Sequence, residues 1–264
     1  MLTQALAPLL EALRPIARSA GAAVLDIYRS DFSVRDKTDT SPVTDADEQA
    51  EAIILSGLAQ LTPTVPVVAE EAFAAGRIPA IGAEFWLVDP LDGTREFVAR
   101  NGEFTINIAL VRDGRPVLGI VFAPALDCYY AGTFDSGAQL EDASGSRAIR
   151  CRPLPAEGVT VVASRSHGDA AALERMLSNY RVAQRKTAGS SLKFCLIACG
   201  NADLYPRFGR TMEWDTAAGQ AVLTAAGGAV TDVVGRPLRY GKSGFENPDF
   251  IARGDWSYLD PQTR

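Results

Sequence analysis

Hydrophobic positions along the chain predict two halves of different architecture. The first thirty residues are apolar at helical spacing, with Pro15 as a point where the helix could kink or restart, and a second helix is expected from Thr44 or Asp45 to about Gln60. Apolar runs then predict strands at 65–69, 85–88, 104–111, 117–122 and 128–133. The last three form an antiparallel meander, so the N-terminal half is expected to be α+β.

The pattern changes after a polar stretch at 141–158 that is rich in Ser, Gly and Pro. Strands and helices then alternate, with expected strands at 159–163, 182–185 and 203–205 and expected helices at 170–179, 191–199 and 215–226. This alternation predicts an α/β C-terminal half. We place the boundary near residue 153, which gives an N-terminal domain of 1–153 and a C-terminal domain of 154–264.

Acidic residues recur where the predicted strands end and helices begin. Asp89 ends the 85–88 run, Pro90 interrupts the strand, and Gly93 allows a turn that brings Asp92 back beside Asp89. The full set is Asp47, Glu70, Asp89, Asp92 and Asp215, of which Asp215 is also expected to cap the last helix. Carboxylates without His or Cys partners favour Mg²⁺ or Mn²⁺. Two such ions would suit hydrolysis of a phosphate ester.

Composition and charge exclude several classes of function. The chain has 264 residues, 47% hydrophobic content and a net charge of −6, so binding to a nucleic acid polymer is not expected. No run approaches the roughly 20 apolar residues of a transmembrane segment, and no secretory signal pattern occurs, which favours the cytoplasm. The four cysteines lack a Cys-x-x-Cys spacing, so neither zinc nor disulfides are expected.

Two further features could contact an anionic substrate. Ser190 lies in a Gly-Ser-Ser turn before a predicted helix, where free N–H groups attract phosphate, although serine is also a common cap. His167 follows the predicted strand 159–163, where open α/β sheets bind ligands, although a lone histidine is more often a surface residue. A phosphate-binding P-loop is excluded, because Arg236 stands where its first Gly is required.

Three segments resemble the signatures of the inositol monophosphatase-like, magnesium-dependent, lithium-sensitive phosphatases: Ala-Glu-Glu at 69–71, Asp-Pro-Leu-Asp-Gly-Thr at 89–94 and Trp-Asp-Thr-Ala-Ala-Gly at 214–219. Within that superfamily, the segments 95–110, 164–167, 189–195 and 204–207 resemble the bacterial 3'(2'),5'-bisphosphate nucleotidases. The resemblance implies a layered αβαβα sandwich. It also implies hydrolysis of adenosine 3',5'-bisphosphate to AMP and phosphate, and of 3'-phosphoadenylyl sulfate to adenylyl sulfate, in sulfur assimilation.

The resemblance also implies roles for individual residues. Two or three Mg²⁺ ions, for which Mn²⁺ can substitute, would be held by Glu70, Asp89, the Leu91 carbonyl, Asp92 and Asp215. The catalytic residues would be Glu70, Asp47 and Thr94, with Thr94 oriented by Asp47 to position the attacking water. Contacts with the substrate would come from Glu70, Leu91, Asp92, Gly93, Thr94, His167, Ser190, Lys193, Arg207 and Asp215.

Several alternatives stay open at this point. The same metal core could serve an inositol or other sugar monophosphatase, which needs less positive charge than Lys193 and Arg207 supply. A non-catalytic sensor of metal and nucleotide is a rival, but it would not require the pair of Thr94 and Asp47. The protein could be a monomer or a homodimer, and it could associate peripherally with the cytoplasmic face of the inner membrane.

Overall fold

A computed structural model describes residues 5–36, 42–164 and 169–256. His167, one of the predicted substrate contacts, lies outside these described residues. Within the described part of the chain, no helix has both the length and the apolar character needed to span a membrane.

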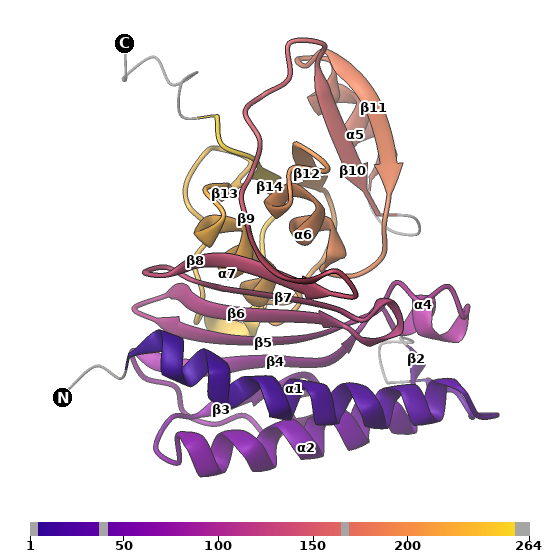
Figure 1. The fold of residues 1–264 in the computed structure, drawn as a ribbon, viewed down its shortest axis with the longest axis vertical. Coiled ribbons are helices and arrows are strands. Elements are labelled where there is room, and N and C mark those ends of the chain that lie inside the picture. The colour runs from indigo at the N-terminus through magenta and orange to yellow at the C-terminus, as the bar shows by residue number, and fades with distance from the viewer. Residues whose placement is uncertain (1–4, 37–41, 165–168, 257–264) are drawn as a thin grey trace.

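Helices and sheets alternate in five layers (Figure 1). The helices are α1 (Leu6–Tyr28), α2 (Asp45–Leu61), α3 (Glu70–Ala74), α4 (Thr94–Val98), α5 (Ala170–Leu177), α6 (Leu192–Ala198) and α7 (Ala217–Ala225), with 3₁₀ turns η1 (Pro124–Leu126) and η2 (Ser243–Phe245). Helices α1 and α2 cover one face of a seven-stranded sheet, and α6 and α7 lie between that sheet and a five-stranded one. Helix α5 packs on the far side, which confirms the expected αβαβα sandwich.

The seven-stranded sheet has its strands in chain order: β3 (Val67–Ala69), β4 (Glu84–Asp92), β5 (Thr105–Arg112), β6 (Arg115–Ala123), β7 (Cys128–Thr133), β8 (Gly137–Asp142) and β9 (Gly145–Ile149). Only the β3–β4 pair is parallel, and the remaining pairs are antiparallel. The predicted meander is therefore confirmed and extended. Strands β8 and β9 reach into the 141–158 stretch, where polarity alone indicated a linker.

The five-stranded sheet has the order β11-β10-β12-β14-β13. Its strands are β10 (Val159–Ala163), β11 (Val182–Thr187), β12 (Leu204–Arg207), β13 (Ala229–Asp232) and β14 (Phe250–Arg253), and a separate pair joins β1 (Arg35–Asp36) to β2 (Pro42–Val43). Strand β10 is parallel to both neighbours, as the predicted alternation of strands and helices requires, whereas β14 is antiparallel to β12 and β13. Strands β13 and β14 were not predicted.

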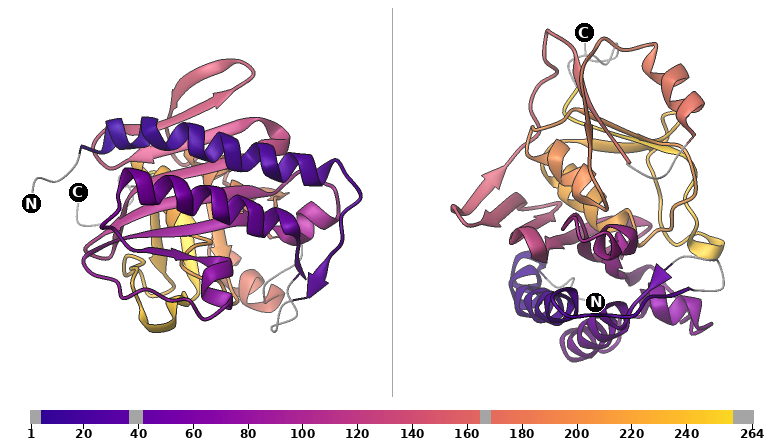
Figure 2. Two further views of the ribbon diagram at one scale, coloured as in Figure 1. Left: turned by 90° about the horizontal axis from the view of Figure 1, so that it is seen from below. Right: turned by 90° about the vertical axis from the view of Figure 1, so that its right-hand side faces the viewer.

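The N-terminal helices follow from the sequence pattern. Helix α1 is one helix with Pro15 inside it, and it lies beside α2 across the sheet (Figure 2). Helix α2 begins with a capping box, in which the Thr44 hydroxyl accepts a hydrogen bond from the Ala46 N–H and the Asp47 carboxylate accepts one from the Thr44 N–H. The cap fixes Asp47 in the first turn.

One hydrophobic cluster joins the two sheets. Alternate residues of β4 face opposite layers, with Trp86 and Val88 toward α1 and α2, and Phe85 and Leu87 toward α6 and α7. The cluster on the inner face continues into the second sheet through Phe250. The chain passes between the sheets at 150–158. The boundary near 153 and the division into two domains stay predictions.

Close packing of α7 on the seven-stranded sheet depends on glycines in that sheet. A Cβ atom at Gly119 would lie 2.5 Å from the Ala218 carbonyl oxygen, and one at Gly132 would lie 2.9 Å from the Val222 Cα. The missing side chains let α7 approach β6 and β7 closely. This contact places the turn before α7 beside the end of β4.

We expect Gly119→Ala to lower the free energy of unfolding by about 1–3 kcal/mol, because the added methyl group forces α7 away from the sheet. Gly82→Ala is the matched control, since a Cβ there meets no atom within 4 Å, and it should change stability by less than about 0.5 kcal/mol. Chemical denaturation measures both. Equal stability of the two variants would contradict the close approach.

Candidate active site

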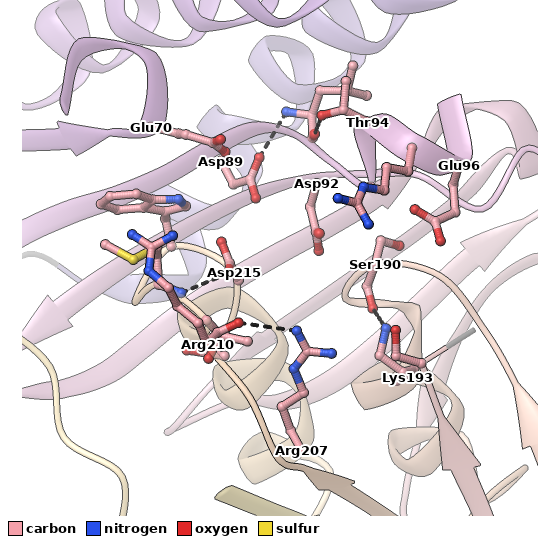
Figure 3. Close-up of a pocket in the computed structure, with 18 of the residues that line it drawn as sticks. Glu70, Asp89, Asp92, Thr94, Glu96, Ser190, Lys193, Arg207, Arg210 and Asp215 are labelled. Carbon is pink, nitrogen blue, oxygen red and sulfur yellow. Dashed lines mark hydrogen bonds between the residues drawn. The ribbon is translucent and has the colours of Figure 1, made fainter. Parts of the chain in front are cut away.

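A pocket of about 650 Å³ opens where β4, α3 and α4 meet α6, β12 and the turn before α7. Its walls include four of the five predicted acids, Glu70, Asp89, Asp92 and Asp215 (Figure 3). Residues predicted to contact the substrate share the same pocket, namely Leu91, Gly93, Thr94, Ser190, Lys193 and Arg207. The fold thus brings together residues that are more than a hundred positions apart in the chain.

A bulge in β4 places Asp89 and Asp92. Strand β4 was expected to stop at Asp89, but it continues to Asp92, with Asp89 opposite Asn107 and Asp92 opposite Thr105. A register shift between the two acids absorbs the intervening residues, so a bulge rather than a break accommodates Pro90. The Asp89 carboxylate, only 1% exposed, accepts a hydrogen bond of 3.0 Å from the Leu91 N–H.

A chain of hydrogen bonds links Asp92 to the turn that carries Asp215. The Asn107 amide donates to the Asp92 carboxylate at 3.2 Å and to the Ser191 hydroxyl at 2.9 Å. The Ser191 hydroxyl donates in turn to the Asp215 carbonyl at 2.8 Å. Asn107 and Ser191 are both buried, so the two halves of the pocket are tied by polar contacts beneath its surface.

The expected role of Asp215 as a helix cap is wrong. Thr216 is the N-cap of α7, and the Asp215 carboxylate instead accepts a hydrogen bond of 2.8 Å from the Met212 N–H, three residues earlier. This contact closes a turn and directs the carboxylate into the pocket (Figure 3). Burial raises the pKa of Asp215 well above its usual range, and the charges of Asp92 and Glu70 raise it further.

Glu70 begins α3, directly after β3. The start of α3 is held by Glu51, a buried residue of α2 whose carboxylate accepts a hydrogen bond of 2.7 Å from the Glu71 N–H. Burial raises the pKa of Glu51. The sequence analysis missed Glu51, although an acid at the apolar spacing of α2 was an available signal.

Thr94 and Asp47 meet at the edge of the pocket. The Thr94 hydroxyl lies 3.4 Å from an Asp47 carboxylate oxygen and 3.3 Å from the Leu91 carbonyl oxygen. The other Asp47 oxygen accepts 2.8 Å hydrogen bonds from the Thr44 N–H and hydroxyl, which fixes its orientation. Gly93 precedes Thr94 with φ of +88°, a conformation that favours glycine, and lets α4 start immediately after β4.

Basic side chains gather on the C-terminal side of the pocket. Lys193 is 5% exposed, and its ammonium donates to the carbonyls of Ala188 and Ser190 at 3.3 and 2.5 Å. Burial lowers the pKa of Lys193 to about 8, against the opposing attraction of Asp92. The Arg207 guanidinium donates to the Arg210 carbonyl at 3.2 Å.

Further pocket residues were missed by the sequence analysis, among them Phe73, Arg95, Arg210 and Trp214. Arg95 follows Thr94 and Trp214 precedes Asp215, so their places in the sequence next to predicted site residues could have indicated them. Arg210 follows Arg207 by three residues across Gly209, whose φ of +130° turns the chain back toward the pocket. No periodic pattern in the sequence marks such a turn.

The oxygen donors of the pocket are of the type that Mg²⁺ and Mn²⁺ bind. Among the residues that the structure describes, however, no three His, Cys, Asp or Glu side chains are grouped as a ready-made ion site. The acids share one pocket without that tight grouping, and repulsion between carboxylates favours their separation. The donor set fits a hard divalent cation.

The chain is similar to known proteins over most of its length. The family model described as the inositol monophosphatase family matches residues 5–257. The chain is 46% identical over 245 residues to the Escherichia coli K12 protein named 3'(2'),5'-bisphosphate nucleotidase CysQ, covering 92% of this chain and 98% of that one.

Two solved structures are similar over nearly their whole length. One is CysQ from Bacteroides thetaiotaomicron, with a TM-score of 0.78 and 34% identity over 94% of this chain and 97% of that one. The other is an inositol monophosphatase from Zymomonas mobilis, with a TM-score of 0.80 and 25% identity over 98% of this chain and 97% of that one. This chain belongs to the inositol monophosphatase family.

Proposed function

We propose that this protein is a magnesium-dependent 3'(2'),5'-bisphosphate nucleotidase. It hydrolyses adenosine 3',5'-bisphosphate to AMP and phosphate, and it also acts on 3'-phosphoadenylyl sulfate. The observation that carries the proposal is a pocket in which four carboxylates face Lys193 and Arg207. Identity of 46% to a relative with that name, over 92% of this chain, supports the same activity.

Glu70, Asp89, Asp92, Asp215 and the Leu91 carbonyl are the residues that would hold Mg²⁺ in this pocket. When bound, the metal lowers the pKa of water and offsets charge on the leaving oxygen. The bulge in β4 supplies three of these oxygen donors within four residues, and α3 and the Met212–Asp215 turn supply the others. No single segment could do so alone.

Thr94 and Asp47 have the arrangement needed to orient the attacking water. The Thr94 hydroxyl has one proton to donate, and both the Asp47 carboxylate and the Leu91 carbonyl are within reach. Donation to either acceptor leaves the lone pairs of the hydroxyl oxygen available to accept a hydrogen bond from water. Asp47 is only 2% exposed and is fixed by Thr44, so the hydroxyl is positioned before the substrate binds.

The basic side of the pocket supports a substrate with two phosphates. Arg207 and Lys193 flank a region beside the acids, and Arg210 lines the same wall (Figure 3). Guanidinium groups pair with phosphate through two parallel hydrogen bonds. A sugar monophosphate places its only phosphate at the carboxylates and leaves this second basic region unused, which makes an inositol monophosphatase the weaker candidate.

We expect purified protein with Mg²⁺ to hydrolyse adenosine 3',5'-bisphosphate at least tenfold more efficiently than inositol 1-phosphate, because only the bisphosphate uses both regions of the pocket. Phosphate release with each substrate measures kcat/KM. As a control for the site, Asp92→Asn should lower kcat by two or more orders of magnitude. Preference for the inositol ester would refute the proposed substrate, and normal turnover by Asp92→Asn would refute the proposed metal ligands.

The pH profile should report Lys193. Its pKa is lowered to about 8 in the free protein, so its charge is present below that pH and is lost as the pH rises through it. Because kcat/KM reports the ionisation of the free enzyme, kcat/KM for the bisphosphate should decline above about pH 8. Lys193→Met should have a low kcat/KM without this decline, and Lys186→Met, which changes a lysine outside the pocket, should keep it. An identical decline in Lys193→Met would contradict the assignment.

A further inference from the structure

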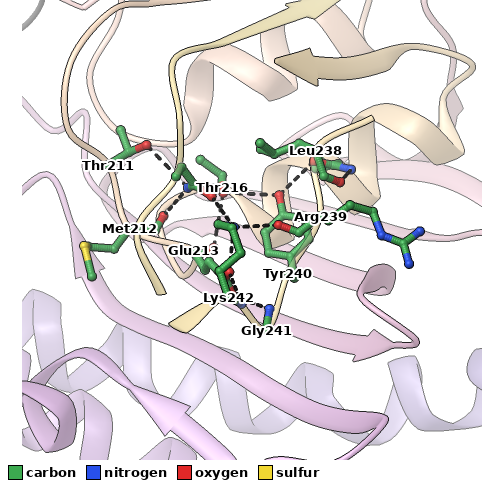
Figure 4. Close-up of polar contacts among 11 residues, drawn as sticks. Thr211, Met212, Glu213, Thr216, Leu238, Arg239, Tyr240, Gly241 and Lys242 are labelled. Carbon is green, nitrogen blue, oxygen red and sulfur yellow. Dashed lines mark hydrogen bonds and ion pairs between the residues drawn. The ribbon is translucent and has the colours of Figure 1, made fainter. Parts of the chain in front are cut away.

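Glu213 is a buried carboxylate that precedes Asp215 by two residues but is not among the residues that line the pocket. Its side chain is 0% exposed and accepts three hydrogen bonds from one loop (Figure 4). The donors are the Gly241 N–H at 2.7 Å, the Lys242 N–H at 2.9 Å and the Lys242 ammonium at 2.6 Å. Glu213 therefore fastens the 239–247 loop to the turn that carries Asp215.

The same loop also contacts the turn on both sides of Asp215. The Asn247 amide donates to the Met212 carbonyl at 2.7 Å and to the Thr216 hydroxyl at 3.0 Å. Lys242, already paired with Glu213, donates to the Asn247 side-chain oxygen at 3.1 Å. The ion pair and the amide thus form one connected network that spans the turn.

Met212 connects this network to the pocket. Its N–H is the donor that holds the Asp215 carboxylate at 2.8 Å, and its carbonyl is held by Asn247. The Glu213 N–H donates to the Phe245 carbonyl at 2.8 Å, so the backbone beside Met212 is also fixed. A shift of the loop would move Met212 and change the direction of the Asp215 carboxylate.

The chemistry of Glu213 exceeds what packing alone requires. Burial of a carboxylate is unfavourable unless the charge is paired and its oxygens accept hydrogen bonds, and both conditions are met here. Neutral side chains could fill the same space at a lower desolvation cost. The directional bonds of the pair instead fix the distance between the loop and the turn.

We propose that the ion pair of Glu213 and Lys242 is a positioning element that holds Asp215 in its metal-binding orientation before any ion arrives. The inference rests on the proposed function, in which Asp215 is a metal ligand. Glu213 touches neither metal nor substrate and acts through the backbone of Met212. Loss of the pair therefore weakens metal binding without removing any ligand.

The test is Mn²⁺ binding to the substrate-free, full-length protein, followed by electron paramagnetic resonance, with unfolding measured separately in EDTA. Glu213→Gln should bind Mn²⁺ about tenfold or more weakly, within the range typical of residues that orient metal ligands. Lys242→Met should show a smaller loss, because Lys242 is 31% exposed and Glu213 keeps its two backbone donors. If Glu213 contributes only to stability, Glu213→Gln should have a lower unfolding midpoint and an unchanged Mn²⁺ affinity.

Asp203→Asn is the matched control. Asp203 is also buried, at 1% exposure, pairs with Arg152 at 2.7 Å and accepts a 2.7 Å hydrogen bond from the Thr160 N–H. It lies outside the set of pocket residues. Its replacement should destabilise the protein to a similar degree as Glu213→Gln while changing Mn²⁺ affinity by less than about twofold.

Unchanged Mn²⁺ affinity in folded Glu213→Gln, or an equal loss in Asp203→Asn, would overturn the positioning role. If Glu213→Gln does not fold, Lys242→Met decides the question in the same way. Activity of the wild-type protein on the bisphosphate separates the two proposals. If the wild type hydrolyses the bisphosphate and the variants bind Mn²⁺ as tightly as the wild type does, only the positioning role is refuted. If the wild type neither binds Mn²⁺ nor hydrolyses the bisphosphate, both proposals are refuted.

Discussion

Four carboxylates line one pocket, and much of the surrounding structure serves to hold them in place. Carboxylates that face a common space repel one another, and burial raises the cost of keeping them charged. The raised pKa of Asp215 is the direct expression of that cost. Each of three acids is therefore restrained by a nearby donor, the Leu91 N–H for Asp89, the Asn107 amide for Asp92 and the Met212 N–H for Asp215.

The layered fold supplies those restraints from separate directions. The seven-stranded sheet provides a rigid edge for Asp89 and Asp92, and α2 holds the start of α3 through Glu51. Close packing of α7 against Gly119 brings the Asp215 turn to the same edge. Hydrogen bonds through Ser191 then join the two halves of the pocket. Neutral residues would pack in this pocket at lower cost, so the buried acids lower the stability of the fold.

The sequence predicted most of the regular elements and the acids because both depend on local patterns, whereas the order of the layers followed from the family resemblance. Apolar periodicity located most helices and strands, and the cap at Thr44 located the start of α2. The pattern failed where tertiary contacts decide the outcome. The bulge in β4 depends on pairing with β5, and the turn at Asp215 depends on Met212 and on a loop more than twenty residues later.

Residues that only position the side chains of the site were the hardest to predict from the sequence. Glu213 looks like an ordinary surface acid in the sequence, and only its burial and its backbone partners distinguish it. Glu51 falls at the apolar spacing of α2, but its bond to the Glu71 N–H is visible only in the structure. Lys193 was predicted as a phosphate contact, but its lowered pKa follows from burial that no sequence pattern reveals. Positions of charged groups in the core are set by three-dimensional packing, so they become visible only in the structure.

We infer that the acids of this pocket form a phosphatase site that holds two or three metal ions. The most direct measurement is a crystal structure of the protein with Mn²⁺, in which anomalous scattering locates the ions independently of any assumed ligand. We expect two or three peaks, two of them about 3.5–4 Å apart, bonded to oxygens of Glu70, Asp89, Asp92 and Asp215. Peaks outside this pocket, or a saturated pocket without any peak, would contradict it.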